Sequence, residues 1–110
     1  MKTNSRAKGA RGELELANTL TAQGFPSRRT QQFCGKGDDS ADIVAVGLES
    51  YHIECKRTER FKLYEALEQA QRDAKNGRVP TVIHRQSARP WVVVLGLEDF
   101  LSLVKPQKEE

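Results

Sequence analysis

Two carboxylates and a lysine stand at spacings that allow them to form one reactive site. In the segment 51–56, strand alternation places Glu54 and Lys56 on the same face, about 6.5–7 Å apart along the strand. By itself this pair is typical of a surface ion pair on a solvated strand. Asp42 favours a reactive site over a surface ion pair, because it opens the preceding apolar segment, where an aspartate is intrinsically disfavoured.

The loop between the two segments decides whether Asp42 joins the pair. A three-residue loop at residues 47–49 sets Asp42 directly opposite Glu54, whereas a loop at residues 48–50 sets it opposite Lys56. Either odd-length loop brings both carboxylates and the lysine to one face of the sheet. A two-residue loop would instead turn Asp42 away.

These residue types point to a particular chemistry. Two facing carboxylates repel each other, so a site that keeps both ionised requires a divalent cation between them. Oxygen ligands select Mg²⁺, with Mn²⁺ as a substitute, rather than zinc. A lysine beside the cation offsets the negative charge that develops on a phosphate attacked by water. The residues therefore predict hydrolysis of phosphodiesters.

A third carboxylate, Glu13, lies on the apolar face of a predicted helix. On a helical wheel it falls within the arc that contains Ala17 and Leu20, whereas Glu15 points to solvent. Burial of a carboxylate is costly unless a cation pairs with it, which favours Glu13 as a member of the acidic cluster. The alternative is a first-turn glutamate that the helix dipole stabilises and whose carboxylate reaches solvent.

Predicted helices and strands must position these residues. The predicted helices span residues 5–23, 62–76 and 98–104, and the predicted strands span residues 28–33, 41–46, 51–56, 80–85 and 91–95. The order is αβββαββα, and the β-helix-β portion permits a parallel crossover. We therefore expect an α/β fold in which helices flank a mixed central sheet.

The composition is that of a single globular domain over residues 1–110, with flexible tails at 1–4 and 105–110. Hydrophobic residues make up 37% of the 110 residues and charged residues 30%. Neither an apolar run of about 20 residues nor a secretory signal is present, so we expect no membrane association. Two cysteines cannot build a disulfide framework, which favours a cytoplasmic protein.

The net charge of +3 conceals basic clusters near the predicted site. Such clusters suit contacts with the phosphates of a nucleic acid, although an ordinary solvated surface accounts for the net charge equally well. The candidates for phosphate contacts are Lys8, Arg11, Arg28, Arg29, Arg57, Arg60 and Lys62.

Taken together, these residues resemble the PD-(D/E)XK nuclease superfamily. The resemblance is carried by Asp42, by Glu54-Cys55-Lys56 and by the preceding helix with Glu13. The opening helix also resembles that of the archaeal-type Holliday junction resolvases and their phage relatives. The residues that match there are Lys8, Gly9, Glu13, Leu16, Leu20, Gly24 and Phe25, and the resemblance extends over residues 5–104.

The resemblance implies a restriction-endonuclease-like αβββαβ core and a function. Glu13, Asp42 and Glu54 would be the acidic residues of a Mg²⁺ site, and Lys56 the catalytic lysine. The family cuts two opposed strands of a four-way DNA junction as a homodimer. Ala41 replaces the proline of the signature, and Ser40 is the nearest candidate for a serine that the resolvases use before the aspartate.

Several assignments have alternatives. Related VRR-type nucleases add a glutamine on the second helix, for which Gln69 and Gln71 are candidates, although each also fits a polar residue beside a core face. His52 shares a face with Glu54 but is more typical of a strand-edge surface residue. The rival functions are a VRR-type or other structure-specific nicking nuclease on the same site and a non-catalytic DNA-binding module.

Two further expectations concern assembly and setting. The apolar segment 91–104 offers a surface for a homodimer interface, and a two-fold dimer would match the symmetry of a junction. The expected location is the cytoplasm of a bacterial, archaeal or phage-infected cell.

Overall fold

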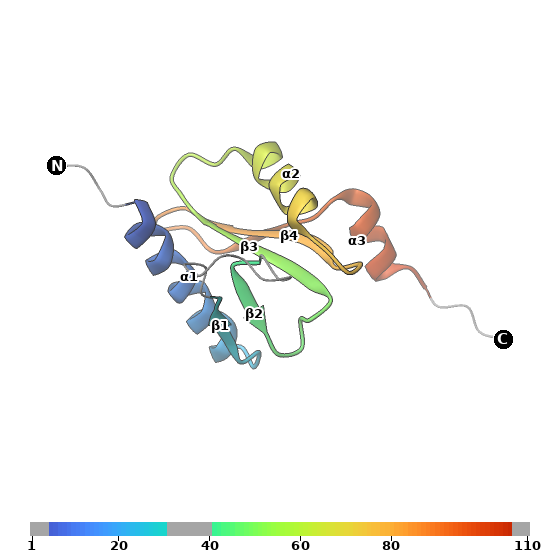
Figure 1. Cartoon of the computed structure of the whole chain (residues 1–110), viewed down its shortest axis with the longest axis horizontal. Coiled ribbons are helices and arrows are strands. Elements are labelled where there is room, and N and C mark those ends of the chain that lie inside the picture. Colours follow the sequence, from blue (N-terminus) through green and yellow to red (C-terminus); the bar gives the residue numbers. More distant parts are fainter. Residues whose placement is uncertain (1–4, 31–40, 107–110) are drawn as a thin grey trace.

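The computed structural model describes residues 5–30 and 41–106, where the chain forms three helices and five strands (Figure 1). The helices are α1 (Ser5–Ala22), α2 (Leu63–Asp73) and α3 (Leu97–Val104). The strands are β1 (Ser27–Arg29), β2 (Ile43–Ala45), β3 (Tyr51–Arg57), β4 (Val79–Arg85) and β5 (Val92–Val94). This confirms the predicted order of elements.

Several predicted boundaries shift. Helix α2 ends at Asp73 rather than at Asn76, because Ala74 has an extended backbone with φ −67° and ψ 134°. Asn76, with a φ of 60°, could not continue a right-handed helix either. Strand β1 begins at Ser27, and residues 31–33 of the predicted first strand lie outside the described residues. Ser40 lies outside them as well.

The strands form one mixed sheet in the order β1-β2-β3-β4-β5. Strands β3 and β4 are parallel over their whole length, from Tyr51 opposite Val79 to Arg57 opposite Arg85, and α2 makes the crossover between them. The other neighbouring strands are antiparallel. The predicted α/β class, mixed sheet and crossover are therefore confirmed.

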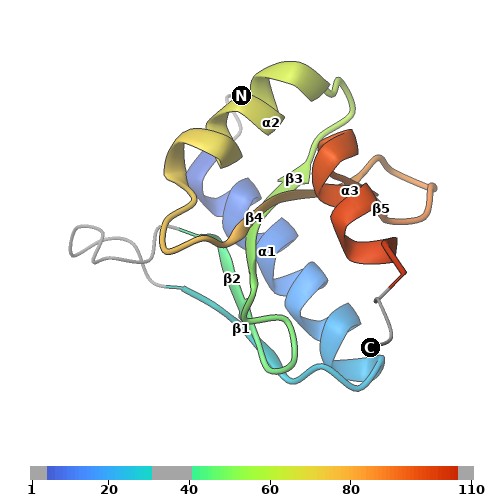
Figure 2. The ribbon, with the colours of Figure 1, turned by 90° about the vertical axis from the view of Figure 1, so that its right-hand side faces the viewer.

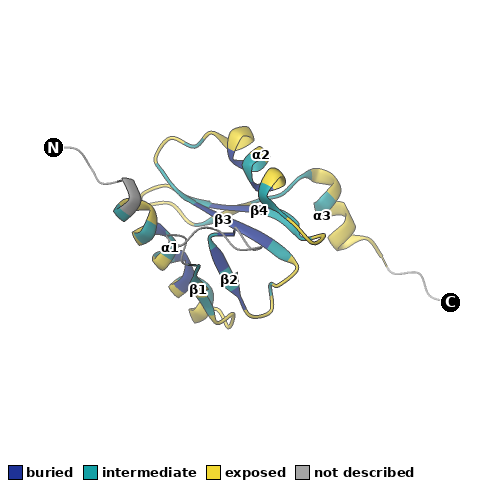
Figure 3. Ribbon diagram, viewed as in Figure 1, coloured by how far each residue is buried: buried dark blue, intermediate teal, exposed yellow. Residues whose placement is uncertain are grey.

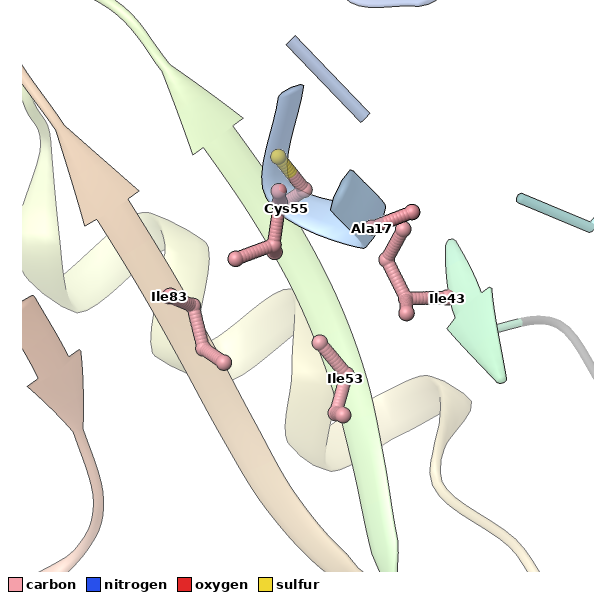
Figure 4. Close-up of a cluster of buried hydrophobic side chains, with 6 residues drawn as sticks. Ala17, Ile43, Ile53, Cys55 and Ile83 are labelled. Carbon is pink, nitrogen blue, oxygen red and sulfur yellow. The ribbon is translucent and has the colours of Figure 1, made fainter. Parts of the chain in front are cut away.

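Helices α1 and α2 cover opposite faces of this sheet (Figure 1). Alternation along β3 turns Ile53 and Cys55 toward α1, whereas His52 and Glu54 lie on the face that α2 covers. Figure 3 shows that the buried residues concentrate on the central strands. The cluster beneath α1, seen in Figure 4, consists of Leu16, Ala17, Ile43, Ile53, Cys55 and Ile83, and that beneath α2 of Ala66, Ala70 and Val82.

Strand β2 pairs with β3 only at its start. Within the described residues the pairing is at a single position, Ile43 opposite Ile53, whereas β3 pairs with β4 throughout. Of the two registers that the sequence left open, this is the one given by a three-residue loop at residues 47–49, and it sets Asp42 opposite Glu54. The rest of β3, up to Arg57, extends past the start of β2.

Strand β5 forms one edge of the sheet, and helix α3 follows it in the chain; both lie on the right in Figure 2, with α3 toward the viewer. No residue of α3 is buried. Trp91 is half-buried and packs against the core beneath α1. The exposed apolar residues of this edge are Val92, Val93, Leu97, Phe100, Leu101, Leu103 and Val104.

None of the described helices combines the length and the apolar composition needed to cross a lipid bilayer.

Candidate functional site

A cavity of about 390 Å³ lies beside the second half of β3. It receives side chains from α1, β3 and α2 and from Asp42, which directly precedes β2. All four residues predicted to be catalytic line it, together with basic and polar neighbours. The principal lining residues are Lys8, Glu13, Asp42, Glu54, Lys56 and Gln69.

Asp42 is held at the point where the β2–β3 pairing ends. Its backbone N–H donates to the carbonyl of Ile53 at 2.9 Å, and its Oδ2 accepts the backbone N–H of Cys55 at 2.8 Å. The carboxylate thus binds an amide of the neighbouring strand. This contact fixes Asp42 beside the strand segment that carries Glu54 and Lys56.

Glu54 is almost completely buried, with 3% of its side chain exposed. Its Oε2 lies 2.6 Å from Nε2 of His52, whose side chain is 1% exposed. The expectation of a strand-edge surface position for His52 is wrong, because β3 lies in the middle of the sheet and α2 covers this face. A buried carboxylate requires such a partner, so His52 fixes the orientation of Glu54.

Lys56 extends into the cavity, where Gln69 contacts it. The Nζ of Lys56 donates to Oε1 of Gln69 at 3.0 Å. Gln69 is half-buried beside Ala70 on α2 and reaches the cavity through this contact, whereas Gln71 is exposed. The helical spacing of Gln69 relative to Ala66 and Ala70 is the signal in the sequence that identifies its face.

Glu13 is half-buried, with 18% of its side chain exposed, and it is paired with a cation as its position on the helix demands. The partner is Arg29 on β1, whose Nε donates to Oε1 of Glu13 at 3.0 Å. Arg29, a predicted phosphate contact, therefore already neutralises an acidic residue of the cavity.

Gly12 allows α1 to approach β3 closely. A Cβ atom built on Gly12 would lie 2.6 Å from Cβ of Arg57, closer than real Cβ contacts. The glycine is buried, and it directly precedes Glu13. Its lack of a side chain therefore sets the distance between Glu13 and the strand that carries Glu54.

Glu15 does not simply point to solvent, as the helical wheel predicts. Its Oε1 accepts the Nε of Arg57 at 3.0 Å and the Nη1 of Arg85 at 3.1 Å. Burial alone raises the pKa of Glu15, but the hydrogen bonds and charges of Arg85 and Arg57 outweigh it and lower the pKa. Arg57 is thereby tied to α1, which the wheel could not indicate because both arginines are distant in sequence.

The other predicted phosphate contacts remain on the surface. Within the described residues, those that are exposed are Lys8, Arg11, Arg28, Arg60 and Lys62.

Cys55 is a buried free thiol, as predicted for a small apolar residue beside Ile53. Burial, together with the negative charges of Asp42 and Glu13, raises its pKa to about 12. The thiol therefore stays protonated at neutral pH, and it does not serve as a nucleophile.

The acidic residues of the cavity fit a hard divalent cation. Glu13, Asp42 and Glu54 offer carboxylate oxygens, which Mg²⁺ and Mn²⁺ prefer. The described residues also contain a more compact group, in which ligand atoms of His52, Glu54 and Asp73 all lie within 4.8 Å of one another. Glu54 belongs to both sets. Asp73 carries no signal in the sequence, because only the crossover brings the end of α2 over β3.

Comparisons with known proteins give one family and a structural relative. A family model described as "Phage putative PDDEXK endonuclease" matches residues 4–110. Hjc, a Holliday junction resolvase from the archaeal hyperthermophile Archaeoglobus fulgidus, has a similar structure, with a TM-score of 0.60 and 26% sequence identity. The match covers 80% of this chain and 72% of that chain. A search of curated proteins found no match.

Proposed function

Because the chain belongs to the phage family of PDDEXK endonucleases, we propose that it is a metal-dependent endodeoxyribonuclease that resolves four-way DNA junctions as a homodimer. Membership of the PD-(D/E)XK nucleases was predicted from the sequence and is confirmed. The observation that carries the finer proposal is the convergence of Glu13, Asp42, Glu54 and Lys56 on one cavity.

In the proposed site, Asp42 and Glu54 hold the cation, and Glu13 completes the acidic cluster from α1. The proposed ion is Mg²⁺, which Mn²⁺ can replace. When bound, it supplies positive charge that stabilises a phosphate under attack. The contacts from Cys55 N–H and from His52 hold the two carboxylates in place before DNA arrives.

Lys56 is the proposed catalytic lysine. An ammonium group has three N–H donors, and the contact with Gln69 uses one of them. The other donors can bind a phosphate oxygen or orient the attacking water, and the positive charge offsets negative charge that develops on the phosphate. Gln69 acts through Lys56 and is a positioning residue.

DNA is the proposed substrate, and the similarity to a Holliday junction resolvase supports a branched form. The exposed residues Lys8 and Arg11 lie on α1 beside the cavity, where they can bind backbone phosphates. Arg60 and Lys62 line a neighbouring cavity that shares Lys56, and Arg28 is an exposed residue of β1. An enzyme with this substrate would act in the cytoplasm of a bacterial, archaeal or phage-infected cell.

The exposed apolar edge formed by β5 and α3 is the proposed homodimer interface. Phe100→Glu places a charge in it, and because Phe100 is 49% exposed the protomer should still fold. We expect the mass measured by size-exclusion chromatography with light scattering to fall from dimer to monomer. Ser102→Glu on the same helix introduces the same charge at a polar position and is the control. Persistence of a dimer in the Phe100 variant would place the interface elsewhere.

The decisive experiment compares cleavage of a labelled four-way junction with that of a linear duplex of equal length, with Mg²⁺ and with chelator. We expect Mg²⁺-dependent cuts in opposed strands of the junction and little cutting of the duplex. Equal cutting of both substrates would support the proposed catalytic site but would exclude a preference for junctions. Tight binding without cutting in Mg²⁺ or Mn²⁺ would instead indicate a DNA-binding module.

The contact between Gln69 and Lys56 favours a second candidate, a nicking nuclease of the VRR type. The sequence resemblance associates such enzymes with a glutamine on the second helix. Nicks in one strand, without a matching cut in the opposed strand of the junction, would support this candidate over a resolvase.

A further inference from the structure

A second cavity adjoins the proposed catalytic cavity. Its volume is about 410 Å³, and it shares Lys56, Thr58 and Gln69 with its neighbour. Its remaining wall is formed by the turn before α2 and by one face of that helix, from Glu65 to Arg72. A DNA strand whose scissile phosphate lies beside Lys56 can therefore continue into this second cavity.

The charge of the second cavity suits a phosphate. Four basic residues line it, namely Lys56, Arg60, Lys62 and Arg72, whereas only two of its lining residues are acidic, Glu65 and Glu68. None of the three basic residues other than Lys56 forms an ion pair with a described residue, whereas Arg57 at the other side of the site is paired with Glu15 and Glu59. Their charges are thus available to a ligand.

The start of α2 strengthens this preference. Lys62 is the N-cap residue of α2, and it makes no side-chain cap hydrogen bond. The first backbone N–H groups of a helix lack partners within the helix and attract anions. Here they lie beside Arg60 and Lys62 rather than beside a capping serine or aspartate.

An aromatic ring completes the cavity. Phe61 lines it, and its ring is stacked on His84 with 4.0 Å between the centroids and 8° between the planes. His84 in turn contacts the carbonyl of Thr58 at 2.9 Å, which fixes the pair. A base or deoxyribose can pack against such a fixed ring. Thr58 Oγ1 is buried without a partner among the described residues, and Thr58 borders both cavities.

We propose that this second cavity binds a flanking nucleotide of the cleaved strand, with its phosphate held by the basic residues of the cavity wall and its sugar or base against Phe61. Of these basic residues, Arg60 precedes the start of α2 and Arg72 lies on its last turn. The inference rests on the proposed nuclease function, because that function supplies the strand. It assigns to the protein one defined phosphate contact beyond the scissile phosphate.

The first test measures binding, so that it does not depend on cleavage. In an Asp42→Asn background, Arg60→Gln/Arg72→Gln is compared with Lys75→Gln/Lys105→Gln, which removes two exposed charges elsewhere. The dissociation constant for junction DNA is measured by fluorescence anisotropy at several salt concentrations. Each lost phosphate contact lowers the slope of log K against log salt by about 0.9 on duplex DNA, so for the one contact proposed we expect a fall of about 0.9 for the first pair and none for the second.

The second test locates the nucleotide. Single neutral methylphosphonates are placed at successive positions beside the cleavage point, and the loss of affinity is measured for the unsubstituted and the Arg60→Gln/Arg72→Gln forms of the Asp42→Asn protein. We expect one flanking position whose substitution weakens only the form with both arginines. Equal losses in both forms at every position would overturn the proposal, as would an unchanged salt slope.

These outcomes separate the two proposals. If the protein cuts junction DNA normally but shows no coupling between the arginines and a flanking phosphate, the proposed function stands and the proposed role of the second cavity is rejected. If the protein never cuts DNA but shows this coupling, the proposed role of the second cavity stands and the nuclease function is rejected. Thermal unfolding of each variant verifies that it is folded.

Discussion

Replacement of Asp42 by asparagine, or of Glu54 by glutamine, is expected to abolish DNA cleavage while DNA binding persists. Each change removes a negative charge and a metal ligand but keeps the size of the side chain. A bound cation contributes several kcal/mol to stabilisation of the transition state, so its loss should lower the cleavage rate by about a thousandfold or more.

The local contacts make these two variants good tests. The amide oxygen of an asparagine at position 42 can still accept the N–H of Cys55, and a glutamine at position 54 can still form a hydrogen bond with His52. We therefore expect both proteins to fold. The measurements are single-turnover cleavage of a labelled junction with saturating protein and Mg²⁺, and anisotropy for binding.

Glu98→Gln provides the control for loss of a carboxylate, because Glu98 is exposed on α3 away from the cavity. It should cut at the rate of the unsubstituted protein. If either Asp42→Asn or Glu54→Gln cuts normally, the cation is held by other residues.

Lys56→Met is expected to lower the rate of cleavage about 100- to 1,000-fold, because one preorganised donor to developing charge is commonly worth that factor. The effect should appear in the single-turnover rate, with binding of DNA only slightly weaker. Methionine keeps the apolar stem of lysine and removes its charge. Unchanged cleavage by this variant would exclude Lys56 from the reaction.

Gln69 provides an internal test of the same assignment. Because it contacts Lys56, Gln69→Leu should lower the rate by less than Lys56→Met, and the double variant should be no slower than Lys56→Met alone. Additive losses would mean that Gln69 acts independently of the lysine. Gln71→Leu, at an exposed position of the same helix, is the matched control.

The sequence was most informative where local pattern governs structure. Alternation and helical periodicity identify the order of the elements, and an odd-length loop before β3 leaves two registers, of which the structure has the one that pairs Ile43 with Ile53. The unfavourable placement of Glu13 on an apolar face correctly indicated a paired carboxylate, although the partner, Arg29, is known only from the structure.

The sequence was least informative where non-local pairing decides. His52 was assigned to the surface because a seven-residue strand does not reveal that it will lie between two neighbours and under a helix. The contacts of Glu15 with Arg85 and of Lys56 with Gln69 likewise join segments that meet only after the crossover. Periodicity indicates the face of an element but not what will cover it.

The missing side chain of Gly12 means that the width of the proposed active site depends on a residue that offers no ligand atom. A methyl group there would clash with Arg57 and would displace the start of α1, moving Glu13 away from the carboxylates of Asp42 and Glu54. Glu13 would keep its place on α1, and Asp42 and Glu54 would keep theirs beside each other, but Glu13 would no longer be aligned with the other two carboxylates. In a mutational screen, position 12 would therefore be as intolerant of substitution as the acidic residues themselves, and an inactive variant found there would be mistaken for the loss of a catalytic group.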